Sequence, residues 1–189
     1  YWGLSSSGQF TTNSATWLAS EHLQETLPWP FKWIWKIDTM PKIKIFLWQM
    51  CHNAIPTRGT LFRRGCHIDP QCPLCLNDIE TADHLFAECP QTNKVWDLAK
   101  IHNWLPPTTF PHHSTDWLAT FETFISTYNT KSLQRISFLL WSIWKMRNAV
   151  IFHHEVFHPI KCLIRAKKLS AEWRIRTCMS VDEYLQGHP

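Results

Sequence analysis

The chain has 189 residues, of which 44% are hydrophobic and 18% are charged, and its formal net charge is +4 at pH 7. A chain of this length and apolar content can bury a core, as one domain or as two small ones. Neither a secretory leader nor an apolar run of bilayer-spanning length is visible, so we expect no membrane partner.

The N-terminal part, residues 1–28, is predicted to be a loop followed by a helix. The loop is rich in Gly and Ser, and the helix is expected from about Asn13 to Leu27, with Thr12 as its cap and Pro28 at its end. The next stretch, residues 29–37, is ambiguous: its apolar residues alternate as in a strand, but three of them also share a helical face.

Two helices are predicted before the first cysteine pair. Residues 42–53 carry an apolar stripe at helical spacing, made by Ile43, Phe46, Leu47, Met50 and Ala54. Thr57 is suited to cap a second, short helix that runs through Arg64, with Gly65 just after its end.

Charge is segregated along the chain. Residues 32–67 hold seven Lys and Arg against one acid (+6), residues 68–133 hold three against eight (−5), and residues 134–176 hold nine against two (+7). Such basic blocks are the pattern expected for contact with a polyanion, although a run of charge is more often only a solvated face. The candidate phosphate contacts are Lys42, Lys44, Arg58, Arg63, Arg64, Lys145 and Arg147.

A metal site is predicted between Cys72 and Cys89. Cys72, Cys75, His84 and Cys89 follow the spacing C-x2-C-x8-H-x4-C, which supplies the three thiolates and one imidazole of a tetrahedral structural Zn²⁺ site. We expect Thr81 to cap a short helix that carries His84, and Pro90 to stop that helix. Because all four positions are filled by protein, this pattern favours a fold-holding zinc over hydrolytic chemistry.

The remaining cysteines show no pairing pattern. Cys51, Cys66, Cys162 and Cys178 are left over from the seven in the chain, which suits a reducing compartment. We therefore expect an intracellular protein, nuclear or cytoplasmic. Because the sequence begins at Tyr1 without a methionine, it is expected to be a fragment or a processed product, and an organellar leader could have been removed.

The C-terminal half is predicted to be helical and separate. A helix over 91–103 completes a zinc-binding module of residues 29–104, and a Pro-rich linker follows at 105–113. Three helices of a bundle are then expected within 114–180: one from Ser114 or Thr115 to 128, a buried one over 132–152, and one opened by Pro159. In the last helix, the apolar positions expected to face inward are Ile160, Leu163, Ile164, Ala171, Ile175 and Cys178.

An ordered series of motifs surrounds the zinc pattern. It comprises Trp33-Ile34-Trp35-Lys36, Pro41-Lys42-Ile43-Lys44, Ile55-Pro56-Thr57, Arg63-Arg64-Gly65, Cys72-x2-Cys75, Glu80-Thr81-x2-His84-x4-Cys89-Pro90 and Val95-Trp96. This series, over residues 29–98, resembles the reverse transcriptase zinc-binding domain of plant LINE-type (non-LTR) retrotransposons. Weaker resemblance extends to residues 8–15 and 141–152. The resemblance favours a helical turn at 29–37.

The resemblance implies a mainly α protein in which a small CCHC zinc knuckle is packed with helices and followed by a helical bundle. It implies a role in binding RNA or DNA, with a reverse transcriptase as a further partner. In the family a polymerase domain lies upstream and a ribonuclease H domain often follows; neither is recognisable in these 189 residues.

Two other interpretations are open. A domesticated structural or protein-interaction module would use the twelve tryptophans to dock a partner. Catalysis by this chain is not expected, because no polymerase-type aspartate pair, acidic set for two metals or glycine-rich phosphate loop is present in the sequence.

Overall fold

The computed structural model describes residues 9–12, 31–107 and 116–186, with side chains up to 178. The chain divides into two compact units, residues 1–33 and 34–189. The predicted helix over 13–27 lies outside the described residues. In the described residues the fold is mainly α, as predicted. The β-type pairing there is an isolated antiparallel bridge between Gln71 and Ile79.

Short helices precede the metal-binding segment. α2 spans Lys32–Lys36, α3 spans Pro41–Cys51 and α4 spans Arg58–Arg63. Four residues of the predicted stripe of α3 are confirmed, since Ile43, Phe46, Leu47 and Met50 are buried, whereas Ala54 lies beyond the end of the helix and is half-buried. The predicted ends of α4 are confirmed too: the Thr57 hydroxyl accepts from the Thr60 amide, and Gly65 has a φ of +85° just beyond the helix.

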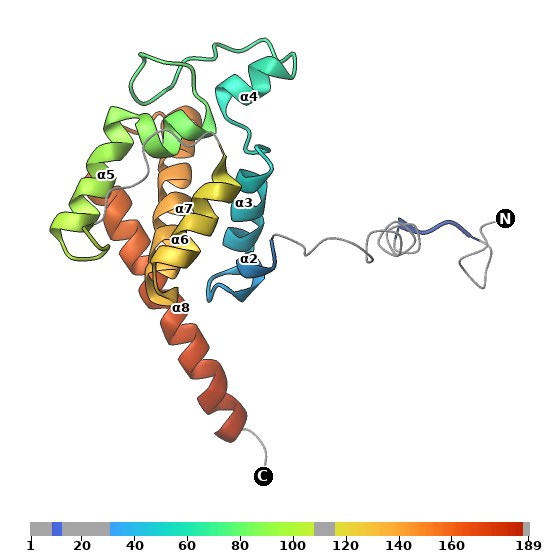
Figure 1. Cartoon of the computed structure of the whole chain (residues 1–189), viewed down its shortest axis with the longest axis vertical. Coiled ribbons are helices and arrows are strands. Elements are labelled where there is room, and N and C mark those ends of the chain that lie inside the picture. Colours follow the sequence, from blue (N-terminus) through green and yellow to red (C-terminus); the bar gives the residue numbers. More distant parts are fainter. Residues whose placement is uncertain (1–8, 13–30, 108–115, 187–189) are drawn as a thin grey trace. The chain divides into compact units, whose positions relative to one another are not determined.

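The longer helices form the body of the second unit. They are α5 (Pro90–Ile101), α6 (Trp117–Thr127), α7 (Thr130–His153) and α8 (Pro159–Gln186). α7 is the central helix and contacts α3, α6 and α8 (Figure 1). Its apolar stretch 136–144 is buried on nearly all sides, which confirms the prediction of a buried central helix. No helix in the described part of the chain is both long and apolar enough to cross a membrane.

One aromatic cluster joins the metal-binding segment to the later helices. The ring of Phe46 in α3 lies 5.9 Å from that of Phe86, 5.3 Å from that of Trp141 and 6.4 Å from that of Trp144. Phe86 in turn meets Trp117 of α6 at 5.9 Å. The separate bundle predicted over 114–180 is therefore not what the structure has: residues 34–189 pack as one unit, because Trp141 and Trp144 turn toward α3.

The buried face of α8 also differs from the prediction. Cys162, Leu163 and Ala166 are buried, whereas Ile160, Ile164, Ile175 and Cys178 are exposed. Of the predicted inward positions, Leu163 is buried and Ala171 is half-buried. The helix is rotated about its axis relative to the prediction, because α5 and α7 contact the side of α8 that carries Cys162, Leu163 and Ala166.

Candidate metal centre and basic surface

The four predicted metal ligands are brought together. Their ligand atoms, three Sγ and one imidazole nitrogen, all lie within 4.8 Å of one another. The Sγ atoms of Cys72 and Cys89 are 4.0 Å apart, and Cys75 Sγ is 3.2 Å from His84 Nε2. A tetrahedral zinc with Zn–S bonds of about 2.3 Å places its sulfurs about 3.8 Å apart and a sulfur and nitrogen about 3.6 Å apart. The cluster therefore fits Zn²⁺ in size and in donor type.

The first cysteine pair is held by a tight turn. The Leu76 amide donates to the Cys72 carbonyl at 2.9 Å, and Leu76 adopts a left-handed φ of 60° to close the turn. The Cys72 amide donates to the Asp78 carbonyl at 2.8 Å, and this hydrogen bond fixes the segment after Cys75 against the start of the loop. Cys72 and Cys75 thus point to the same side with two residues between them.

The second pair is held by a π-helical turn, η1, over His84–Glu88. The Thr81 hydroxyl accepts from the His84 amide at 2.9 Å, as the capping prediction requires. The Cys89 amide donates to the His84 carbonyl at 2.7 Å, so five residues are wound into one turn and both ligands lie on one face. The short helix ends at Glu88, before Pro90, as predicted, and Pro90 also starts α5 at the first helical position.

The cluster perturbs the protonation of its own members. Hydrogen bonding with Cys89 and burial raise the pKa of Cys72 to about 12, and the hydrogen bond with Cys72 raises the pKa of His84 to about 9. The pKa of Cys89 is lowered by its hydrogen bond with Cys72. Zinc binds thiolates and neutral imidazole, so loading the site releases protons. On the far side of the imidazole, Asp78 Oδ2 lies 3.9 Å from His84 Nδ1, the position of an outer-shell carboxylate.

Glu80 anchors the metal-binding loop, a role that the sequence analysis did not assign. Its carboxylate is fully buried and forms a two-pronged ion pair with Arg147 of α7: Arg147 Nε donates to Oε1 at 2.7 Å, and Nη2 donates to Oε2. The Arg58 amide, at the start of α4, also donates to Oε2 at 2.6 Å. The Gly59 amide donates to the Glu80 carbonyl at 3.0 Å. Loop, α4 and α7 are therefore joined at one residue.

This pairing corrects one predicted phosphate contact. Arg147 is only 3% exposed, and its guanidinium also lies 4.8 Å from the Trp144 ring and donates to Asn148 Oδ1 at 3.0 Å. A buried guanidinium that is already paired with a carboxylate is not available to a phosphate. The Arg147 prediction is therefore wrong in its role, although the residue matters for the site.

The other predicted cations fall into two groups. Lys42 and Lys44 are two positions apart and point to different sides of α3, and Lys44 Nζ donates to the Trp35 carbonyl at 2.7 Å. Lys42, Arg63, Arg64 and Lys145 are exposed, and Arg58 is half-buried with Nη1 donating to the Gln71 carbonyl at 3.3 Å. Lys44 is thus separated from the rest.

A partly exposed stripe of α7 links three of these cations. We define the α7 stripe as Trp141, Lys145, Asn148 and Phe152, which are spaced by four, three and four residues and so share one helical face. Lys42 of α3 lies with its Nζ 5.9 Å from the Trp141 ring, at one end of the stripe. Arg58 of α4 lines a mainly apolar cavity of about 540 Å³ together with Asn148 and Phe152, at the other end.

Comparison with known proteins supports the metal centre. Residues 10–96 match a family model described as zinc-binding in reverse transcriptase. A putative ribonuclease H protein of Arabidopsis thaliana is 27% identical over 100 residues, which are 50% of this chain and 16% of that protein. The chain thus spans a small part of the relative's length. No solved structure matches the chain. Residues 10–96 of this chain are therefore similar to the zinc-binding domains of reverse transcriptases.

Proposed function

We propose that the chain is a non-catalytic module that holds RNA template or target DNA beside a reverse transcriptase, with Zn²⁺ bound by Cys72, Cys75, His84 and Cys89 to keep the fold. The family match over residues 10–96 supports the zinc and the reverse transcriptase context. The nucleic-acid contact rests on one observation, which is the alignment of Lys42, Lys145 and Arg58 along the α7 stripe.

The stripe offers both kinds of group that a nucleic-acid strand requires. Lysine and arginine contact phosphates, and the exposed ring of Phe152 and the half-buried ring of Trp141 offer surfaces on which bases can stack. Phe152 is 69% exposed, so its ring is accessible to a base. Arg63 and Arg64, exposed at the end of α4, would extend the basic surface beyond Arg58.

A structural role for zinc follows from the ligand set. Two thiolates and the imidazole are buried, and the four protein ligands complete a tetrahedron, so no position is left for a reactive water. The metal's contribution is to fix the loop that carries Glu80, and through Glu80 the start of α4. Arg58 is thereby placed at the end of the α7 stripe.

The test removes the three aligned cations together. Lys42→Gln, Arg58→Gln and Lys145→Gln in one chain should weaken binding to an oligonucleotide and should flatten the plot of log affinity against log salt concentration. Each lost phosphate contact lowers that slope by roughly 0.7 to 0.9, so the triple variant should lose about two units. Fluorescence anisotropy of a labelled RNA and a labelled DNA at several salt concentrations measures this.

The matched control changes the same charge elsewhere. Lys161→Gln, Arg165→Gln and Lys168→Gln remove three exposed cations from α8, outside the α7 stripe, and should leave affinity and slope close to the unmodified chain. Equal losses in both triple variants would show that only net charge matters, and the proposed surface would be abandoned.

A protein-docking function is the second candidate. It is favoured by exposed apolar residues where α5 meets α8: Ile101 is 71%, Ile160 62% and Ile164 59% exposed. Ile160 and Ile164 line a cavity of about 250 Å³ with Leu98. A chain that shows no salt-dependent binding to RNA or DNA would favour this second function.

A further inference from the structure

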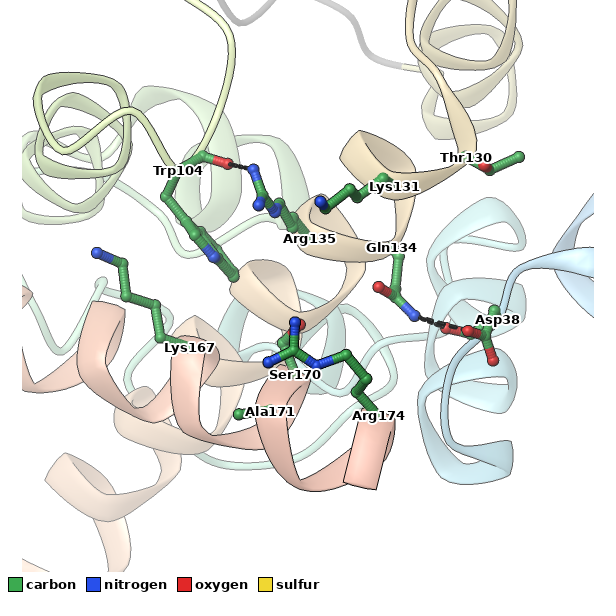
Figure 2. Close-up of a pocket in the computed structure, with 10 residues that line it drawn as sticks. All are labelled: Asp38, Trp104, Thr130, Lys131, Gln134, Arg135, Lys167, Ser170, Ala171 and Arg174. Atoms are coloured by element: carbon green, nitrogen blue, oxygen red, sulfur yellow. Dashed lines mark hydrogen bonds between the residues drawn. The ribbon is translucent and has the colours of Figure 1, made fainter. Parts of the chain in front are cut away.

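A second basic site lies away from the zinc centre and the α7 stripe. A cavity of about 410 Å³ opens between α7 and α8, with Trp104 on one side and Asp38 on the other (Figure 2). Two cations of α7, Lys131 and Arg135, and two of α8, Lys167 and Arg174, line it. Four cations against one carboxylate leave a formal charge of +3 in a space of small-molecule size, which is about 300–1,000 Å³. We call this the α7–α8 pocket.

Arg135 is held in place before any ligand arrives. Its Nη1 donates to the Trp104 carbonyl at 2.8 Å, and its guanidinium lies 6.0 Å from the centre of the Trp104 ring. A guanidinium has five N–H groups, and Trp104 takes one of them, so most of the donor capacity is left for a ligand. A fixed guanidinium loses little conformational entropy when it binds an oxyanion.

Asp38 does not neutralise these cations. Its Oδ2 accepts from Gln134 Nε2 at 3.0 Å and its Oδ1 accepts from Trp173 Nε1 at 2.8 Å, both neutral donors. Among the described side chains, no carboxylate lies within ion-pair distance of Lys131, Arg135, Lys167 or Arg174. By contrast, Lys168 on the neighbouring position of α8 is paired with Glu172 at 3.9 Å.

The backbone adds to the positive potential. Thr130 and Lys131, which line the pocket, are the first two residues of α7, where the amide groups have no acceptor inside the helix. Asn129 caps the helix by accepting from the Ser132 amide, so it does not use those of Thr130 and Lys131. A 24-residue helix presents the positive end of its dipole there.

We propose that the α7–α8 pocket binds a phosphate group, carried either by a free nucleotide or by the 5′ end of a nucleic-acid strand. Four cations that line one cavity suit a dianionic terminal phosphate better than a single phosphodiester, and the cavity has room for the sugar that carries it. The site is distinct from the α7 stripe, so this proposal does not depend on the proposed function.

The first probe is inorganic phosphate, titrated into the zinc-loaded chain and followed by amide chemical shifts. We expect saturable shifts at the residues that line the pocket. Arg135→Gln with Lys167→Gln should weaken phosphate binding about tenfold or more, since each charge-assisted hydrogen bond contributes at least that factor. Lys161→Gln with Arg165→Gln, one lysine and one arginine on the exposed face of α8, is the matched control and should bind as the unmodified chain does.

Because Arg135 also donates a hydrogen bond to Trp104, its substitution could reduce phosphate binding through a folding defect. A second variant that leaves Arg135 unchanged controls for this. Lys131→Gln with Arg174→Gln removes two cations that make no ion pair in the described part of the chain, and it should weaken phosphate binding with unchanged helical content. Absence of saturable binding in the unmodified chain, or equal binding in the pocket variants and the control, overturns the proposal.

Two further ligands distinguish the sources of the phosphate. Tighter binding of ATP than of phosphate, lost in the pocket variants, identifies a nucleotide site. Tighter binding of a 5′-phosphorylated oligonucleotide than of its 5′-hydroxyl counterpart, lost in the same variants, identifies a strand end. The Lys42, Arg58 and Lys145 variant should keep phosphate binding in the pocket, so failure of one proposal is separable from failure of the other.

Discussion

At the scale of single residues, Glu80 and Arg147 connect the metal centre to the helical core. Both side chains are buried, and the carboxylate has three donors, two from Arg147 and one from the Arg58 amide. Taking two charges out of water is costly, and the pair recovers that cost only because its hydrogen bonds are nearly all made. Removing one partner leaves the other charge buried without compensation.

We therefore expect Arg147→Met to destabilise the chain by about 3–5 kcal/mol, the usual cost of breaking a buried pair. Lys145→Met, two residues earlier and exposed, should change the free energy of unfolding by less than about 0.5 kcal/mol. Denaturant unfolding of the zinc-loaded proteins measures both. The Glu80→Gln and Arg147→Met double variant should be less destabilised than the sum of the single variants, because neither charge is then left alone. Additive losses would show that the two side chains act independently.

At the scale of elements, α4 is a short helix fixed by its first residues. Six residues do not make a stable helix alone, so its position depends on the Thr57 cap and on the contacts of Arg58 and Gly59 with Glu80. A Cβ on residue 59 would lie 2.7 Å from the Glu80 carbonyl oxygen and 2.8 Å from Ile79 Cγ2. The close approach of helix and loop requires glycine here.

Gly59→Ala should accordingly destabilise the chain by about 1–3 kcal/mol, although alanine is the better helix former, because backbone must move to admit the methyl group. Gly65→Ala tests the opposite case. Its Cβ would meet nothing within 4 Å, but its φ of +85° strains any other residue, and we expect a loss of about 1 kcal/mol. Urea unfolding midpoints compare the two. A neutral Gly59→Ala would mean that α4 is not held against Glu80 in solution.

Features that depend on neighbouring residues could be predicted from the sequence, whereas features that depend on distant residues could not. The ligand set, the Thr57 and Thr81 caps and Gly65 depend on neighbours in the chain, so spacing and residue type were sufficient. The role of Arg147 depends on Glu80, which is 67 residues away, and a charged residue in a basic block gives no local sign of burial.

The buried face of α8 could not be predicted for a related reason. Two sets of apolar residues that share Leu163 occur at helical spacing: one adds Ile160, Ile164 and Ile175, and the other adds Cys162 and Ala166. The larger isoleucines favoured the first set, but contact with α5 and α7 buries the second. The spacing of apolar residues shows that a helix has an apolar face. Which of two such faces is buried depends on the helices that pack against it.

At the scale of the whole molecule, the described part of the second unit has a continuous core rather than a zinc knuckle beside an independent bundle. Phe86, between His84 and Cys89, packs on both Phe46 and Trp117, and the Trp96 indole N–H donates to the Phe86 carbonyl at 2.9 Å. The ion pair of Glu80 and Arg147 adds a second link to α7. Loss of the metal should therefore affect helices far from the ligands.

Cys75→Ser should lower the zinc content and destabilise the entire second unit. Structural zinc sites contribute on the order of 10–16 kcal/mol in zinc-finger peptides, which is comparable to the whole stability of a domain, about 5–15 kcal/mol. Cys178→Ser, which alters an exposed thiol on α8 outside the cluster, is the control and should keep both zinc and stability. Far-ultraviolet circular dichroism reports all helices, whereas tryptophan fluorescence reports the aromatic cluster, and the two should follow one transition in the control. If the Cys75→Ser protein keeps the helical signal of α6 to α8 and unfolds in a transition of its own, the C-terminal helices are independent of the metal and the shared core is not what stabilises them.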